Sequence, residues 1–159
     1  MRLRRYQPSD RHTLVRLFYE TIQHINRRDY TQDQLDAWSA GCFALTNAFF
    51  RARYTLVAVE GGRIVGYGNI TTSGYLDHLF VHKDFQRQGV AATLCQALEA
   101  YAWTQGLSAI TVHASITALG FFLHRGYQVQ TRQFVSVRGR QLMNFILFKH
   151  LRAPGIEQT

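Results

Sequence analysis

The spacing of apolar and polar positions changes along the chain, and each change of period marks an element of secondary structure. The segment Arg2–Tyr6 predicts a short strand. A helix follows, for which the hydroxyl of Ser9 offers an N-cap. The apolar residues that fall on one face of this helix are Leu14, Val15, Phe18 and Ile22.

A second helix is predicted to begin at Thr31. Thr31 and Gln34 have the spacing of a capping box, in which each side chain satisfies a backbone N–H of the other residue. Tyr30 and Leu35 flank the same turn with the spacing of a hydrophobic staple. This helix also carries Trp38.

Strand-like runs and glycine turns make up most of the rest of the chain. The predicted strands are Tyr54–Glu60, Arg63–Ile70, Tyr75–Val81, Ser108–Ala114, Tyr127–Val137 and Gln141–Lys149. Gly61 and Gly62 join the first two strands as a two-residue hairpin, and Gly139 lies in the turn between the last two. Two helices are predicted between strands, one from Gly89 to near Gly106 and one over Thr117–Arg125.

This order of elements predicts an α/β (α+β) fold with a mixed sheet and helices on both of its faces. The sheet is mainly antiparallel. The helix from Gly89 forms a crossover that makes Tyr75–Val81 and Ser108–Ala114 the one parallel strand pair. At 159 residues we expect a single domain over residues 1–152, followed by a short tail at residues 153–159.

Composition and charge narrow the class of protein. A hydrophobic share of 47% with 13% aromatic residues indicates a folded domain. Cys42 and Cys95 form no metal-ligand spacing, and no apolar run is long enough to cross a bilayer. We therefore expect a cytoplasmic protein with no metal and no membrane partner. The net charge of +8 suits a polyanionic partner, either nucleic acid or a cofactor with several phosphates.

The segment after Val81 indicates the cofactor. It is a loop that contains Gly89 and opens directly into a helix, so several backbone N–H groups lie free at the positive end of the helix dipole. Such a place binds phosphate or pyrophosphate. The loop is neither a Walker sequence nor the three-glycine dinucleotide fingerprint. An ordinary helix start, with glycine relieving backbone strain, is the alternative.

Two motifs together resemble one family. The segment 86–91, Gln-Arg-Gln-Gly-Val-Ala, is similar to the acyl-coenzyme A pyrophosphate loop of the GNAT N-acetyltransferases. The segment 115–127 resembles that family's downstream pattern Asn-x-x-Ala-x-x-Phe-Tyr-x-x-x-Gly-Phe. With the segment from Tyr30 to Trp38, it is also similar to the bacterial YafP-like branch. The resemblance implies the acyl-CoA N-acyltransferase fold and an enzyme that uses acetyl-CoA as cosubstrate.

The resemblance also implies cofactor contacts. The backbone of the strand end pairs with the pantetheine arm, the loop amides hold the pyrophosphate, and Gly89 leaves room for the phosphate. The implied cofactor-binding residues are Leu79, Phe80, Val81, Gln86, Arg87, Gln88, Gly89, Val90, Ala91, Ala92, Ser115 and Phe122. Ser115 replaces the family's asparagine, and capping of the following helix is its alternative role. Phe122 stands where many relatives have a tyrosine that protonates the leaving thiolate, and it cannot donate a proton.

Amine acetylation needs a neutral amine. A lysine-like amine has a pKa of about 10.4, so deprotonating it at pH 7 costs roughly 4–5 kcal/mol. In the family a general base often lies nine or eleven residues before the loop, and these positions are Asp77 and Tyr75. Strand alternation places them on one face, with His78 on the other. Asp77 is the better proton acceptor, directly or through water; a purely structural carboxylate is the alternative.

Acceptor recognition is expected from the first two helices. Tyr30, Trp38 and His24 are the candidate substrate-binding residues, and ordinary core packing is the alternative for the aromatic ones. For His82 and His113 the favoured prediction is a buried histidine whose ring is satisfied by the backbone, and a position in the crevice between the diverging strands is the alternative.

Three functions compete. The first is an N-acetyltransferase with an unidentified amine acceptor, the second is a non-catalytic acyl-CoA sensor, and the third is a basic nucleic-acid-binding module. No nucleic-acid-binding signature supports the third. The last hairpin also offers an edge through which two copies can pair as a homodimer.

Overall fold

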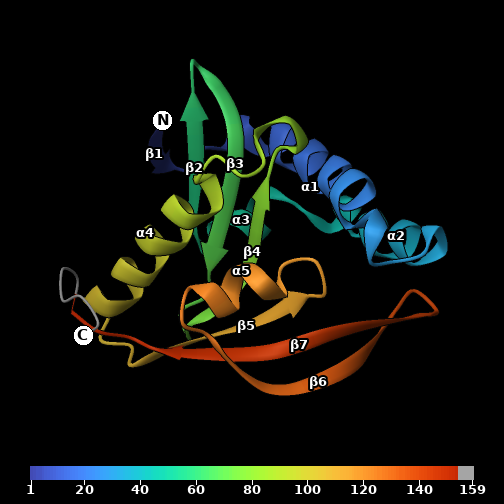
Figure 1. Ribbon diagram of the computed structural model, residues 1–159. Helices are drawn as coiled ribbons and strands as arrows, with labels where there is room; N and C mark the ends of the chain where they lie inside the picture. Colours follow the sequence, from blue (N-terminus) through green and yellow to red (C-terminus); the bar gives the residue numbers. More distant parts are fainter. Residues whose placement is uncertain (154–159) are drawn as a thin grey trace.

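A computed structural model describes residues 1–153 and contains one seven-stranded sheet of order β1-β2-β3-β4-β5-β7-β6 (Figure 1). The strands are β1 (Arg2–Arg5), β2 (Tyr54–Glu60), β3 (Arg63–Ile70), β4 (Tyr75–Val81), β5 (Ala109–Ser115), β6 (Gln128–Val137) and β7 (Arg140–His150). Neighbouring strands are antiparallel except β4 and β5, which are parallel. The predicted mixed, mainly antiparallel sheet with one parallel pair is confirmed.

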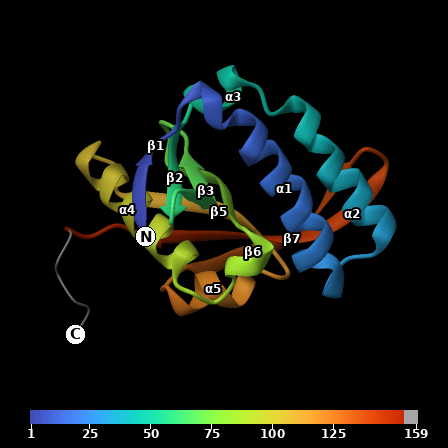
Figure 2. The same cartoon turned by 90° about the horizontal axis from the view of Figure 1, so that it is seen from above.

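Helices cover both faces of this sheet (Figure 2). The helices are α1 (Arg11–Ile25), α2 (Gln32–Ser39), α3 (Asn47–Arg51), α4 (Val90–Thr104) and α5 (Leu119–His124). Short 3-10 turns lie at Pro8–Asp10, Asn26–Arg28, Ala40–Ala44 and Lys83–Phe85. α1, α2 and α3 pack on one face, whereas α4 and α5 pack on the other. The predicted tail falls almost entirely outside the described residues.

Each face of the sheet has its own apolar cluster. Leu94 and Leu98 of α4 are fully buried against one face, and Leu14 and Ile22 of α1 are fully buried against the other. The approach of α4 depends on Gly66, where a Cβ would come within 2.9 Å of the Val90 side chain. A missing side chain on β3 therefore sets the position of the first turn of α4.

The start of α1 differs from the prediction. Ser9 is exposed and lies inside a 3-10 turn, and Asp10 is the N-cap residue of α1. The Asp10 carboxylate accepts the backbone N–H of Gln7 at 2.8 Å and binds Arg4 at 2.8 Å. The prediction of a Ser9 cap is wrong. The N-cap position falls one residue later, at Asp10, whose carboxylate stabilises the preceding turn through Gln7 and Arg4.

The other capping prediction is confirmed. The Thr31 hydroxyl accepts the backbone N–H of Gln34 at 3.3 Å, and the Gln34 side chain accepts that of Thr31 at 2.8 Å. α3 was not predicted from the sequence. It is a five-residue helix in which the Thr46 hydroxyl accepts the backbone N–H of Phe49 at 3.2 Å.

Candidate active site

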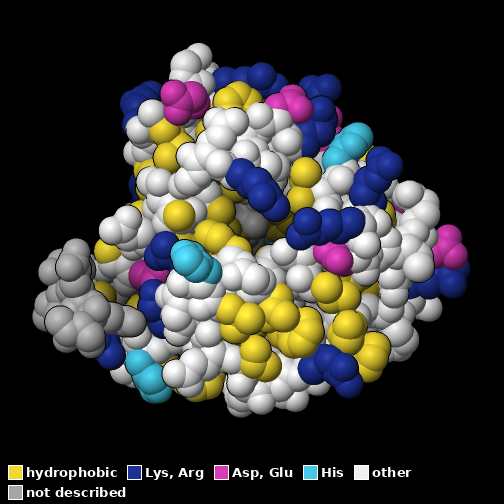
Figure 3. Space-filling model, viewed as in Figure 1, with side chains coloured by type: hydrophobic (Ala, Val, Ile, Leu, Met, Phe, Trp, Pro, Cys, Tyr) yellow, Lys and Arg dark blue, Asp and Glu magenta, His cyan; other side chains and the backbone are white. Residues whose placement is uncertain are grey.

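β4 and β5 open a split in the middle of the sheet. Only Tyr75–Thr111 and Leu76–Val112 pair between them, and the two strands then diverge (Figure 1). β4 continues along β3 while β5 continues along β7. A recess with Lys or Arg side chains at its rim is visible near the middle of this face of the molecule (Figure 3). The split leaves one edge of β4 without a neighbouring strand.

The register of β4 decides which backbone groups face this split. The backbone N–H of His82 donates to Val65 on β3 at 2.8 Å. Because hydrogen-bonded pairs alternate along antiparallel strands, Phe80 bonds toward β3, whereas Leu79 and Val81 present their backbone groups to the split. The Val81 carbonyl is already engaged, because it accepts hydrogen bonds from the Thr21 hydroxyl at 3.1 Å and the Gln86 side chain at 2.7 Å. Leu79 and the Val81 N–H therefore form the open edge.

The loop that follows β4 has the geometry of an anion cradle. Arg87 has a φ of 59° and Gly89 has a φ of 82°, so the chain turns twice through the left-handed region. In α4 the first backbone N–H with a helical partner is that of Thr93, which donates to the Gly89 carbonyl at 3.0 Å. The preceding amides of α4 converge at its positive N-terminus, as an anion requires.

Gly89 is required by its backbone conformation. A Cβ there would meet no protein atom within 4 Å, so packing against the protein does not exclude a side chain. The φ of 82° disfavours any side chain at this position, because residues with a Cβ are strained in the left-handed region.

A β-bulge shapes the start of β4. The pairing shifts between Asn69 and Ile70, so Asp77 is the extra residue of β4. Its carboxylate binds the Arg53 Nε at 2.8 Å, and the Arg53 guanidinium lies 3.9 Å over the Phe49 ring. The other carboxylate oxygen, Oδ1, has no hydrogen-bond partner among residues 1–153. Asp77 is thus oriented by one oxygen and available through the other.

His78 lies beside the same aromatic group. Its ring centroid is 5.1 Å from that of Phe49 and 5.3 Å from that of Phe18. The bulge therefore breaks the strict alternation expected for Asp77 and His78. Burial lowers the pKa of His78 to about 4, and burial raises the pKa of Tyr67 well above its usual value. The Tyr67 hydroxyl and His78 Nδ1 form a hydrogen bond at 2.9 Å, so this ring nitrogen is already engaged.

Tyr75 lies at the closed end of the split, where β4 still pairs with β5. Its ring meets that of His113 edge-on, with centroids 5.0 Å apart. Burial and the charge of Asp77 raise the pKa of Tyr75 to about 12, so its hydroxyl stays protonated at neutral pH and acts as a donor. His113 is exposed, so the prediction of a buried histidine is wrong there. His82 points instead into a cavity on the α1 side of the sheet.

The second motif closes the split from the other side. The Ser115 hydroxyl accepts the backbone N–H of Ala118 at 3.1 Å, which leaves its own hydrogen free to donate. Phe122 is 3% exposed, and its ring packs edge-on against Tyr127 at 5.0 Å. The capping role of Ser115 is therefore present, and Phe122 lies in the apolar core on the α4 and α5 face of the sheet.

The predicted acceptor residues belong to the layer of α1 and α2, where Tyr30 is buried in the core and Trp38 packs against it. Tyr30 and His24 line a surface pocket of about 570 Å³, and Trp38 packs edge-on against Tyr30 at 5.6 Å. The Tyr30 hydroxyl is fully used, since it donates to the Met143 carbonyl at 2.7 Å and accepts the Ile116 N–H at 2.9 Å. Tyr30 thus joins the helical layer to the residue that follows Ser115.

Sequence reasoning missed Arg53, the partner of Asp77. The two residues lie 24 positions apart, so no local pattern links them. Strand register contains the signal, because Tyr54 pairs with Ile70 and Ile70 pairs with Leu76, which brings the residues next to Tyr54 and Leu76 to the same level.

Neither a metal site nor a membrane-spanning helix is found among the described residues. Within them no three His, Cys, Asp or Glu side chains gather as a metal site, and no helix is long and apolar enough to span a membrane.

Comparisons with known proteins identify the family of this chain. The profile of the acetyltransferase (GNAT) domain matches residues 26–145. The chain belongs to the GNAT acetyltransferase family. It is therefore an N-acetyltransferase enzyme, and the implied acyl-CoA N-acyltransferase fold is confirmed.

Similarity to individual proteins places this enzyme in a branch of the GNAT family. It is 30% identical over 147 residues to YafP of Escherichia coli K12, an uncharacterised N-acetyltransferase, covering 92% of this chain and 94% of that one. The YafP-like assignment is thus confirmed. A GCN5-related N-acetyltransferase structure from Rhodopseudomonas palustris is 34% identical, with a TM-score of 0.91 and coverage of 94% and 95%. The PaiA N-acetyltransferase of Thermoplasma acidophilum, solved with coenzyme A, shares the fold at 16% identity, with a TM-score of 0.71 and coverage of 94% and 98%.

Proposed function

We propose that residues 1–152 form a single acetyl-CoA-dependent N-acetyltransferase domain, which moves the acetyl group to a primary amine by direct attack. The observation that carries this proposal is the split between β4 and β5, which opens beside a loop of convergent backbone N–H groups. An edge that accepts an amide-containing arm and a cradle that accepts a pyrophosphate are the two recognition features that coenzyme A requires.

The donor binds along β4 and its loop. The amides of pantetheine pair with the backbone of Leu79 and with the Val81 N–H, and the amides from Arg87 to Ala92 hold the pyrophosphate. Gln86 holds the loop to the end of β4 through its hydrogen bond to the Val81 carbonyl. A protein of the same fold supports acetyl-CoA as the donor, since YncA of Salmonella typhimurium was solved with acetyl-CoA.

Asp77 prepares the amine. Its free Oδ1 accepts an N–H of the incoming amine, directly or through one water, while Arg53 holds Oδ2. The amine loses its proton along this path and then attacks the thioester carbonyl, so that a C–N bond forms and the C–S bond breaks. The negative charge of Asp77 also favours an approaching ammonium group.

Tyr75 acts on the leaving group. With a pKa of about 12 its hydroxyl donates a hydrogen bond to the departing thiolate. Full proton transfer is not needed, because a thiol with a pKa near 8.5 leaves readily as the anion. This assigns to Tyr75 the role that Phe122 cannot fill. Tyr30, Trp38 and His24 remain the predicted acceptor-binding residues.

Thiol release from acetyl-CoA with a panel of primary amines tests this function. We expect turnover with at least one amine, and we expect Asp77→Asn to lower kcat by roughly 10²-fold or more at unchanged acetyl-CoA affinity. Asp33→Asn is the matched control, because Asp33 is an exposed carboxylate that also pairs with an arginine. Parental turnover in Asp77→Asn would remove Asp77 from the mechanism.

A catalytically silent acyl-CoA sensor is the second candidate. It is favoured by Phe122, which deprives the site of the family's usual proton donor. Tight acetyl-CoA binding without thiol release from any amine would support the sensor and contradict the enzyme. A homodimer through the last hairpin, whose strand β6 is one of the two edge strands of the sheet, also remains a prediction.

A further inference from the structure

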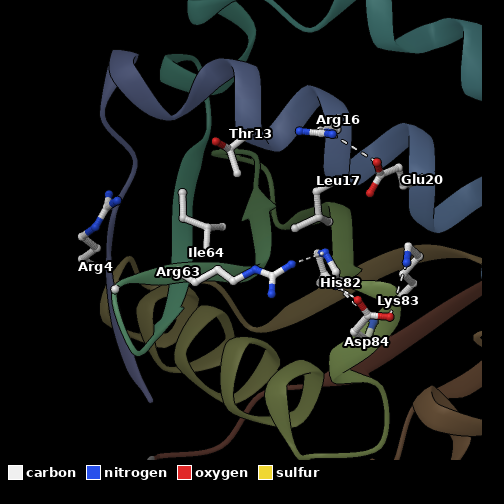
Figure 4. A pocket seen from close by; sticks show the side chains of 11 residues that line it. Arg4, Thr13, Arg16, Leu17, Glu20, Arg63, Ile64, His82, Lys83 and Asp84 are labelled. Atoms are coloured by element: carbon white, nitrogen blue, oxygen red, sulfur yellow. Dashed lines mark hydrogen bonds and ion pairs between the residues drawn. The ribbon is translucent and has the colours of Figure 1, made fainter.

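A second cavity lies on the opposite side of β4 from the split. It has a volume of about 560 Å³ and opens between α1, the β2–β3 turn and the 3-10 turn that follows β4 (Figure 4). None of the residues proposed to hold acetyl-CoA lines it. Leu17 of α1 and Ile64 of β3 form its apolar wall, and Arg63 reaches across its floor toward His82.

Two N–H groups compete for the ring of His82 inside this cavity. The backbone N–H of Asp84 lies 3.1 Å from His82 Nδ1, and Arg63 Nη2 lies 3.2 Å from His82 Nε2. A guanidinium has only donors, and a neutral imidazole has only one acceptor nitrogen, so the ring can accept only one of these two N–H groups. In the tautomer in which Nδ1 accepts the N–H of Asp84, Nε2 carries a hydrogen, and Arg63 Nη2 and His82 Nε2 are two facing donors that share no acceptor.

The charges around this donor pair favour an anion of low charge. Arg16 binds Glu20 at 3.2 Å and Lys83 binds Asp84 at 3.4 Å. Arg4, which also lines the cavity, binds Asp10 at 2.8 Å, so each of these three cations is compensated. Arg63 has no carboxylate partner among residues 1–153. One uncompensated positive charge, flanked by the two carboxylates at the rim, suits a monoanion better than a dianionic phosphate.

We propose that this cavity binds a small organic monocarboxylate. Its two oxygens accept hydrogen bonds from Arg63 Nη2 and His82 Nε2, and its carbon chain packs on Leu17 and Ile64. A planar carboxylate matches the guanidinium fork and satisfies both facing donors at once. The site is independent of the acetyl transfer proposed above.

Titration of the full-length protein with butyrate, without acetyl-CoA, tests this site. The readout is the ¹H–¹⁵N NMR signal of the His82 imidazole. We expect a saturable shift with butyrate, no shift with the neutral butyramide, and a weaker or absent response to inorganic phosphate. Arg63→Gln should raise the Kd for butyrate by roughly tenfold or more, since a charge-assisted hydrogen bond is lost.

The matched control is Arg51→Gln, which removes an exposed arginine of α3 outside the cavity. It should leave the butyrate titration as in the parent. Equal responses to butyrate and butyramide, or an unchanged Kd in Arg63→Gln, would overturn the proposal. Tighter saturable binding of phosphate than of butyrate would overturn the carboxylate class.

Discussion

Gly89 and Gly120 differ in whether the backbone conformation requires a glycine. At neither position would an added Cβ meet a protein atom within 4 Å, yet only Gly89 has a positive φ. Gly89→Ala should therefore cost roughly 1–2 kcal/mol of stability and weaken acetyl-CoA binding, because the loop amides turn away from the pyrophosphate. Calorimetric binding and urea denaturation measure both effects.

Gly120→Ala is the control for this substitution. Gly120 lies exposed in α5, where alanine is favoured over glycine by about 0.5–1 kcal/mol. We expect unchanged binding and equal or higher stability. Equal acetyl-CoA affinities in the parent, Gly89→Ala and Gly120→Ala would show that the loop conformation does not serve the cofactor.

The neutral state of His78 predicts a dependence of stability on pH. Its pKa is about 4 in the folded protein and 6.5 as an unperturbed side chain. Between these values the unfolded chain binds a proton that the folded chain does not. The free energy of unfolding therefore falls as the pH drops from 6.5 toward 4, by at most about 1.4 kcal/mol per pH unit.

His78→Gln should flatten this slope, since glutamine keeps an acceptor for the Tyr67 hydroxyl but does not titrate. His12→Gln, at an exposed position of α1, should retain it. Urea denaturation at several pH values between about 4 and 7 measures the slopes. A parental slope in His78→Gln would assign the effect to other groups.

At the residue scale, the sequence predicted the parts of the site that depend on local pattern. Gly89 and the loop around it were predictable because a strand, a glycine and a helix follow one another directly. Arg53 was not, because its pairing with Asp77 exists only once three strands are in register.

At the scale of elements, one hydroxyl joins the helical layer to the strands that border the site. Tyr30 bridges the Ile116 N–H and the Met143 carbonyl. Tyr30→Phe leaves both groups without this partner and should lower the free energy of unfolding by about 1–3 kcal/mol. Tyr19→Phe is the control, because Tyr19 is 46% exposed and should change stability little.

Thermal or urea denaturation compares these two tyrosine variants. Equal stability of Tyr30→Phe and Tyr19→Phe would mean that water replaces the bridge at no cost. The same comparison carried out on thiol release separates a role of Tyr30 in stability from its predicted role in acceptor binding.

The boundaries of elements with a strong local sequence signal were predicted to the residue. The boundaries of elements without such a signal were not. β2, β3 and β4 have the predicted bounds, since a hairpin glycine pair and clear apolar runs delimit them. β5 lies one residue later than predicted, because its end is set by pairing with β7. α3 was missed because five residues are too few to show a helical period.

At the scale of the whole molecule, the fold and the charge point to different kinds of partner. The fold gives a split with an anion cradle, and the charge of +8 by itself also suits nucleic acid. Salt dependence distinguishes the two. Binding to nucleic acid falls steeply with salt through counterion release, whereas a cradle of backbone amides and a paired strand edge depends on salt much less.

Calorimetric titration of the full-length protein with acetyl-CoA, at roughly 50 mM and 200 mM salt, tests the central claim most directly. The account predicts saturable binding of one acetyl-CoA per chain, with similar affinity at both salt concentrations. Absence of saturable binding at either salt concentration, or affinity lost between them, would contradict it.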